Sequence, residues 1–139
     1  MRVFLDTNVV IDFMGEREGF FEDASHIFAM IEAGLIQASV SSLTIINCAY
    51  ILRKVFDYDS VLNKLGELCR LLEVLPINKQ HLLDAIQTHP HDYEDAVQFF
   101  SANSFLPDVI ITRDKKGFAE FDTPVMTPSE FAERTKTQN

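Results

Sequence analysis

The chain has 139 residues, of which 47% are hydrophobic, and its formal net charge is −9. This length and composition suit one globular domain with a substantial core, and we expect residues 1–139 to form a single domain. The negative charge argues against unspecific electrostatic binding to nucleic acid, but it does not exclude a nuclease whose carboxylates are neutralised locally by metal ions.

The composition also predicts where the protein works. No apolar run is long enough to span a bilayer, and the first residues do not form a secretory signal. The two cysteines, Cys48 and Cys69, stand among apolar residues at helical spacing, which predicts two small core residues rather than a disulfide or a metal pair. We therefore expect a cytoplasmic protein that does not associate with membranes.

In chain order, short apolar runs alternate with segments of helical periodicity. Strands are predicted at 3–5, 37–40, 74–77, 109–112 and 124–126, and Pro76 favours an edge position for the third of them. Helices are predicted at 9–14, 20–33, 43–56, 61–72, 79–87, 92–103 and from residue 127, with a polar turn at 57–60 and fraying at 134–139. This alternation predicts an α/β fold, a three-layer α/β/α sandwich around a mainly parallel sheet of four to five strands.

The first predicted strand leads directly into Asp6, Thr7 and Asn8. Ligands of open α/β sheets bind beyond the carboxyl ends of the strands, so Asp6 stands where a functional site is expected. The alternative is that Asp6 only caps the first helix, although Asn8 is also a natural N-cap for it.

Further acids stand near the fourth predicted strand. Asp114 follows this strand, and Asp92, Glu94 and Asp95 crowd the first turn of the helix that precedes it. Ordinary explanations exist, because the helix dipole favours acids in a first turn and an N-cap at Asp92 would place Asp95 close to a capping-box position. Asp114 can equally be a turn residue.

Right-handed crossovers would bring these acids to one edge of the sheet. Carboxylates that meet there repel one another unless a cation lies between them, and Mg²⁺ commonly takes one or two carboxylates with waters and phosphate oxygens. Such a site can activate water and stabilise the charge that develops on a phosphodiester. Thr112 and Asn8 add a hydroxyl and an amide that can hold an acid in place. Arg113, Lys115 and Lys116 form either a phosphate-binding spot or a solvated loop.

Taken together, these segments resemble the PIN domain family over essentially the whole chain. The resemblance rests on Leu5-Asp6-Thr7-Asn8-Val9, Asp92-Tyr93-Glu94-Asp95-Ala96 and Thr112-Arg113-Asp114 with Phe118. It implies an endoribonuclease that uses Mg²⁺ or Mn²⁺ and acts on RNA, often as the toxin of a toxin–antitoxin pair. On this resemblance we expect catalytic and metal-binding roles for Asp6, Asp95 and Asp114, a possible antitoxin partner and a homodimer.

One position departs from the family pattern. The family usually has a glutamate three residues after a threonine in the helix that follows the second strand, whereas here Thr44 is followed by Asn47. Asn47 offers a carbonyl oxygen but no charge, so Glu94 or Asp92 is expected to supply the missing charge and metal binding is expected to be weak. The alternative function is a PIN-like binding or assembly module with weakened catalysis.

Overall fold

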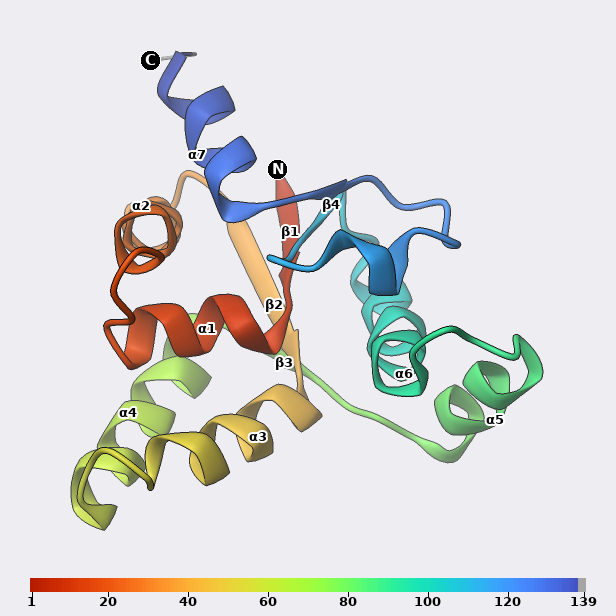
Figure 1. The fold of residues 1–139 in the computed structure, drawn as a ribbon, viewed down its shortest axis with the longest axis horizontal. Helices are drawn as coiled ribbons and strands as arrows, with labels where there is room; N and C mark the ends of the chain where they lie inside the picture. Colours follow the sequence, from red (N-terminus) through yellow and green to blue (C-terminus); the bar gives the residue numbers. More distant parts are fainter. Residues whose placement is uncertain (138–139) are drawn as a thin grey trace.

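The computed structural model describes residues 1–137 and contains one five-stranded sheet (Figure 1). The strand order is β3-β2-β1-β4-β5, and every neighbouring pair is parallel. The strands are β1 (Arg2–Leu5), β2 (Gln37–Ser41), β3 (Glu73–Leu75), β4 (Val109–Ile111) and β5 (Val125–Met126). The predicted α/β fold with a parallel sheet is therefore confirmed, and β3 has the edge position that Pro76 indicated.

Helices cover both faces of this sheet. In Figure 1, α1 to α4 lie on one side of the strands and α5 and α6 lie on the other, which gives the predicted three layers. The helices are α1 (Thr7–Met14), α2 (Phe21–Glu32), α3 (Ser42–Leu52), α4 (Tyr58–Leu71), α5 (Lys79–Gln87), α6 (Tyr93–Ala102) and α7 (Pro128–Thr137), with short 3₁₀ helices η1 (Asn103–Phe105) and η2 (Lys115–Phe118). Within residues 1–137, no helix combines the length and apolar character needed to cross a bilayer.

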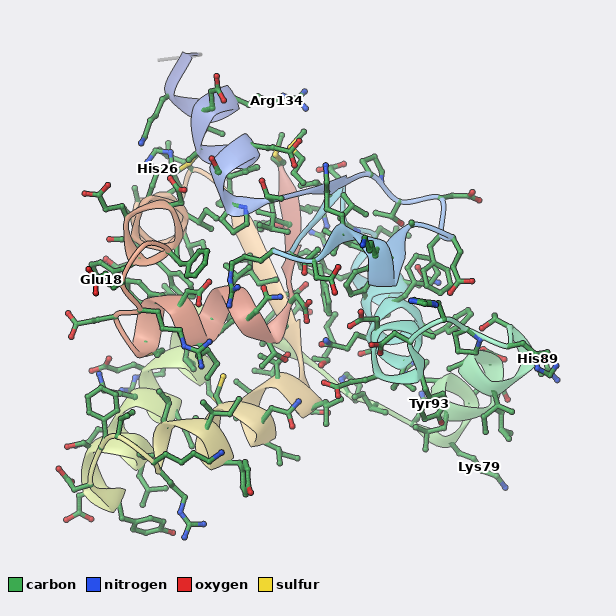
Figure 2. The ribbon with its side chains drawn as sticks, viewed as in Figure 1. Glu18, His26, Lys79, His89, Tyr93 and Arg134 are labelled. Carbon is green, nitrogen blue, oxygen red and sulfur yellow. The ribbon has the colours of Figure 1, made fainter. Side chains whose placement is uncertain are left out.

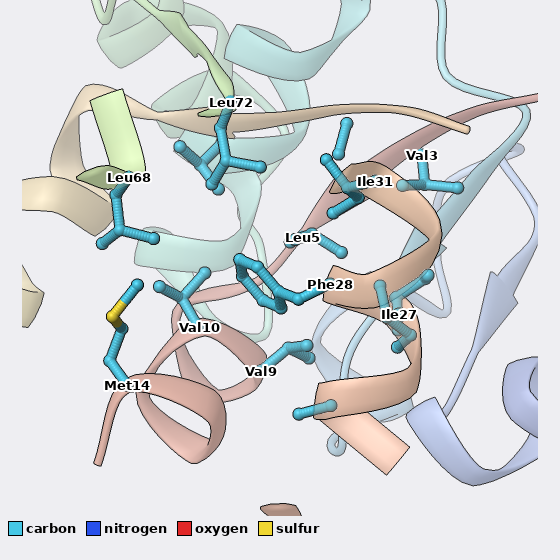
Figure 3. Packing of buried hydrophobic residues seen from close by; sticks show 14 of the residues in the cluster. Val3, Leu5, Val9, Val10, Met14, Ile27, Phe28, Ile31, Leu68 and Leu72 are labelled. Carbon is cyan, nitrogen blue, oxygen red and sulfur yellow. The ribbon is translucent and has the colours of Figure 1, made fainter. Parts of the chain in front are cut away.

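The central strand β1 is buried on both faces because successive side chains of a strand point in opposite directions. Val3 and Leu5 belong to the larger core cluster, which includes Phe28 (Figure 3). Phe4 belongs to a second cluster on the other face together with Phe118. This double burial explains why the strand is a continuous apolar run rather than an alternating pattern.

The helix ends differ from the predictions in several places, and α3 ends at Leu52 rather than at residue 56. Asp6, not Asn8, is the N-cap of α1, because its Oδ1 accepts a hydrogen bond from Thr7 N at 2.7 Å. Helix α4 begins at Tyr58 rather than at residue 61, since Asp57 accepts a hydrogen bond from Ser60 N at 2.9 Å and caps the helix within the predicted turn. Residues 134–137 belong to α7 instead of fraying, and residues 138–139 lie outside the described part.

The two cysteines also differ from each other. Cys48 is fully buried as predicted, and this burial raises the pKa of its thiol to about 12. Cys69 is exposed, so its prediction as a core residue is wrong: it lies on the outer face of α4, whereas Leu68 beside it enters the core.

A buried ion pair ties α1 to the turn that follows β4. Asp12 is 0% exposed, and its carboxylate accepts hydrogen bonds from Arg113 Nε at 2.6 Å and Nη2 at 3.2 Å. The same guanidinium lies over the ring of Phe20, 4.1 Å from the ring centroid. Lys115 is also paired, 2.9 Å from Glu130. Two of the three basic side chains considered for phosphate binding are therefore engaged within the fold.

We expect Asp12→Ala to lower the free energy of unfolding by about 3 kcal/mol, because it leaves a partly buried Arg113 without its partner. Urea denaturation at pH 7 measures this change. Asp122→Ala, which truncates an exposed aspartate, is the matched control and should change stability by less than about 0.5 kcal/mol. Equal stability of the two variants would contradict a stabilising role of the ion pair.

Candidate functional site

An acidic cleft of about 310 Å³ opens where β1 and β4 end. These strands are neighbours in register, with Leu5 opposite Ile111, so the residues that follow each strand lie side by side. Figure 2 labels Tyr93 at the beginning of α6, whose first turn supplies further acids. The cleft is lined by Asp6, Thr7, Asn8, Ile11, Arg17, Ile51, Asp92, Glu94, Asp95 and Asp114. All the acids that were singled out in the sequence therefore face one cleft.

Asp6 lies at the buried end of the cleft and is 7% exposed. Its Oδ1 accepts hydrogen bonds from Thr7 N at 2.7 Å and from Gln98 Nε2 at 2.8 Å. Its Oδ2 accepts one from the Thr112 hydroxyl at 2.7 Å and a longer one from Asn8 Nδ2 at 3.4 Å. Asp6 therefore caps α1 and also lines the acidic cleft, so its capping role does not exclude a role in a site.

Asn8 and Thr112 connect the residues that follow β1 and β4. The side-chain oxygen of Asn8 accepts a hydrogen bond from Arg113 N at 3.2 Å, and its amide lies 3.3 Å from the Thr112 hydroxyl. Thr112 also accepts a hydrogen bond from Asp114 N at 3.1 Å. These contacts hold the turn that carries Asp114 against the start of α1.

The first turn of α6 carries the other acids. Asp92 is the N-cap, and its Oδ1 accepts a hydrogen bond from Asp95 N at 3.0 Å. Asn47 of α3 reaches the same turn, where its Nδ2 donates to Glu94 Oε1 at 3.0 Å. The residue that departs from the family pattern thus contacts an acid of the cleft.

The charges of the cleft repel one another. Burial and the nearby Asp6, Asp92, Glu94 and Asp114 raise the pKa of Asp95 to about 7. Burial also raises the pKa of Asp6, although the hydrogen bonds from Thr112, Thr7 and Gln98 oppose this shift. The pKa of Glu94 is raised by its burial and by Asp6 and Asp92. A cation would relieve this repulsion.

The donor set fits a hard divalent cation. Carboxylate oxygens are the ligands that Mg²⁺ and Mn²⁺ prefer, and Mg²⁺ usually needs only one or two of them together with waters. Within residues 1–137, no group of three or more histidine, cysteine, aspartate or glutamate side chains is arranged closely enough to hold a metal by itself. An ion bound here would therefore keep several waters among its ligands.

Gly117 has a steric role in this cleft. A Cβ atom at this position would collide with the carboxylate of Asp95. The absence of a side chain at Gly117 therefore lets the Asp95 carboxylate lie between η2 and α6 without being displaced. The sequence alone did not single out this glycine.

The sequence analysis also did not identify Gln98 as a residue of the site. It is 0% exposed, and besides donating to Asp6 it accepts hydrogen bonds from Ser41 Oγ at 2.8 Å and Thr44 Oγ1 at 3.1 Å. One signal was available, because a polar residue stands between Val97 and the aromatic pair that follows, three positions after Asp95 and on the same helix face.

Comparisons with known proteins identify the family that the sequence resembles. A family model described as PIN domain matches residues 2–116. Ribonuclease VapC1 of Aquifex aeolicus is 28% identical over 141 residues, which cover 98% of this chain and 96% of the relative. A toxin–antitoxin complex from Klebsiella pneumoniae superimposes with a TM-score of 0.66 at 23% identity, over 91% of this chain and 97% of that chain. VapC20 of Mycobacterium tuberculosis, described as a Sarcin-Ricin loop cleaving toxin, has a TM-score of 0.67 at 11% identity, over 85% and 94%.

The raised pKa of Asp95 predicts a pH-dependent stability. Because the folded state binds this proton more tightly than the unfolded chain, the stabilisation is complete below about pH 4 and is lost as the pH rises through about 7. In the absence of divalent metal, the stability of the wild type relative to Asp95→Asn should fall by about 1–2 kcal/mol between these limits, since solvent screens a partly exposed group. Urea denaturation across this range measures the difference.

Asp122→Asn, at an exposed position, is the control for this comparison, and its difference from the wild type should stay constant with pH. A difference between wild type and Asp95→Asn that does not vary with pH would contradict the proposed repulsion.

A second prediction concerns the contact between Gly117 and Asp95. Gly117→Ala should push the Asp95 carboxylate toward solvent and return its pKa toward the ordinary value of about 3.9. A ¹³C NMR titration of the Asp95 carboxyl group measures this shift. Gly66→Ala is the control, because a Cβ there meets Arg70 Nη1 at 3.4 Å, an ordinary contact, and should leave the Asp95 pKa unchanged. An unchanged pKa in Gly117→Ala would rule out the steric role.

Proposed function

The chain belongs to the PIN domain family, and from this membership we propose that it is a divalent-metal-dependent endoribonuclease. The observation that carries the proposal is the single cleft that contains Asp6, Asp92, Glu94, Asp95 and Asp114. Carboxylates that repel one another lower the stability of the fold, as the raised pKa of Asp95 shows. Acids with such a perturbed pKa in a cleft are candidates for catalysis. The similarity to Ribonuclease VapC1 over nearly the full length of both chains supports the same activity.

In this proposal Asp6, Asp95 and Asp114 hold Mg²⁺ or Mn²⁺, and waters bridge the ion to those carboxylates that do not reach it directly. When bound, the ion supplies an activated water and a positive charge for the phosphodiester that is cleaved. Thr112 and Asn8 hold the Asp6 carboxylate by hydrogen bonds, and Asp92 fixes the first turn of α6 that presents Asp95. These residues determine where the cation and the scissile phosphate can bind.

Arg17 is the basic side chain among the residues that line the cleft. Its side chain is 45% exposed, and its Nη1 lies 4.0 Å from the buried Asp12, which neutralises it only partly. Arginine at such a place can contact a phosphate of the RNA backbone without reading its sequence. We propose this contact in place of the ones considered for Arg113 and Lys115, whose charges are paired within the fold.

We also propose an antitoxin protein as partner and a homodimer as the assembly. The Klebsiella pneumoniae structure that this fold resembles is a toxin–antitoxin complex. Large apolar side chains are exposed on α3 and α4, including Ile46 at 66%, Tyr50 at 67% and Tyr58 at 63%. Ile46 and Tyr50 stand four residues apart and therefore on one face of α3, and apolar side chains that gather on an exposed face are typical of protein-binding surfaces.

Asn47 supports a second candidate function, a PIN-like binding or assembly module with weakened catalysis. A neutral amide at this position lowers the charge that holds a metal. However, Asn47 donates a hydrogen bond to Glu94 and so keeps that carboxylate beside the cleft. The charge missing from α3 is thus supplied by α6, which favours the nuclease as the first candidate.

The decisive test is RNA cleavage in the presence of Mn²⁺. The wild type should cleave a mixed pool of cellular RNA, and Asp6→Asn should reduce the rate by about 100-fold or more, because the carboxylate at the centre of the site loses its charge. Gel electrophoresis of the products measures the rate, and chelation by EDTA should abolish it.

Asp122→Asn serves as the control and should cleave at the wild-type rate. Unchanged cleavage by Asp6→Asn would refute the proposed active site. Absence of cleavage by the wild type, with Mn²⁺ binding retained, would favour the binding module instead.

A further inference from the structure

Gln98 of α6 has a fully buried side chain that makes three hydrogen bonds. Both acceptor sites of its carbonyl oxygen are used, by the hydroxyls of Ser41 and Thr44, and one of its two amide hydrogens is donated to Asp6. An ionised carboxylate only accepts hydrogen bonds, so the Gln98 amide has to present its nitrogen to Asp6. The orientation of this amide is therefore determined by its partners.

The hydrogen bonds form a directed chain that begins on α1. The Thr44 hydroxyl donates its one hydrogen to Gln98, so in its 2.8 Å contact with Thr7 Oγ1 it is the acceptor and Thr7 is the donor. The Ser41 hydroxyl accepts from Thr44 N at 3.3 Å and donates to Gln98. The start of α3 and the start of α1 are thus both connected to the Asp6 carboxylate through one amide.

The two oxygens of Asp6 are held unequally. Oδ1 accepts two short hydrogen bonds, at 2.7 Å from Thr7 N and at 2.8 Å from Gln98, and these fill its two lone-pair directions. Oδ2 accepts one short bond from Thr112, and its second contact, with Asn8, is 3.4 Å long. The spare acceptor capacity of this carboxylate is therefore on Oδ2.

We propose that Gln98 is a positioning residue that holds Oδ1 of Asp6 and so leaves Oδ2 as the oxygen offered to the divalent cation. This inference rests on the proposed function, because it concerns how the same cleft takes its metal. The terminal torsion of an aspartate is broad, so a carboxylate without such a donor can rotate between several orientations. Groups behind a metal ligand that fix its orientation typically change metal affinity by about 10–100-fold when they are replaced.

Gln98→Met tests the proposal because methionine has a similar length and shape but no amide. We expect the apparent affinity for Mn²⁺ to fall by about tenfold or more. The measurement is the melting temperature of the full chain as a function of Mn²⁺ concentration, from which an apparent Kd is fitted. The melting temperature without metal reports the purely structural cost separately.

Ser101→Ala is the matched control, since Ser101 is another buried polar residue of α6. Its hydroxyl donates to Pro76 O at 3.0 Å and makes no hydrogen bond to Asp6. Its loss should lower the melting temperature without metal while the Kd for Mn²⁺ stays at the wild-type value. A role of Gln98 in stability alone would give the same pattern for Gln98→Met.

Thr44→Val is a milder variant that keeps the test valid if Gln98→Met does not fold. It removes one of the two hydroxyls that orient the amide, and it leaves Gln98 in place. We expect a smaller loss of Mn²⁺ affinity, about two- to fivefold, in the same direction.

The outcomes separate the two proposals. If the wild type binds Mn²⁺ and the folded variants at Gln98 and Thr44 bind it with the wild-type Kd, the positioning role is refuted and the proposed nuclease is unaffected. If the melting temperature of the wild type does not respond to Mn²⁺, the metal site and the positioning role are refuted together.

Discussion

The hydrogen-bonded carboxylate of Asp6 is the constraint on which the rest of the site depends. A carboxylate that is only 7% exposed would be costly without partners, and here it accepts hydrogen bonds from the backbone of α1 and from Asn8, Gln98 and Thr112. These donors come from α1, from α6 and from the end of β4. Satisfying one buried acid therefore fixes the mutual positions of three elements, and with them the mouth of the cleft.

Helix α1 is anchored by acids near both of its ends. Asp6 caps its first turn, and Asp12 near its last turn pairs with Arg113, which directly follows Thr112. The adjacent residues Thr112 and Arg113, which follow β4, thus bind the acids near the two ends of α1. Buried ion pairs contribute modestly to net stability, but breaking one is costly, so this pair specifies where the turn after β4 lies. That turn carries Asp114 and Gly117, which approaches Asp95 closely.

The carboxylates of the acidic cleft repel one another, and a bound divalent cation would relieve this repulsion. Burial and neighbouring charges raise the pKa of Asp95 to about 7, so the metal-free protein carries an electrostatic cost that a divalent cation would remove. The hydrogen bond from Asn47 to Glu94 keeps a carboxylate beside the cleft, although Asn47 itself brings no charge. The charges and hydrogen bonds of the cleft come from four segments that are distant in the sequence. These segments lie after β1, in α3, at the start of α6 and after β4.

The sequence by itself determined the fold class, because apolar runs and helical periodicity are local signals that reflect burial directly. It also predicted that Asp6, Asp114 and the acids at the start of α6 meet at one edge of the sheet, because the strand ends of a parallel sheet share one edge. Only the tertiary structure decided the partners of the polar side chains. It showed that Asp6 caps α1 and that Arg113 pairs with Asp12 instead of being free to bind a phosphate. It also showed that Gln98 donates a hydrogen bond to Asp6 and that Gly117 lies against Asp95. The hydrogen bonds of Gln98 with Asp6 and of Arg113 with Asp12 join residues that are 92 and 101 positions apart in the chain. No local pattern encodes which distant group a polar side chain will meet.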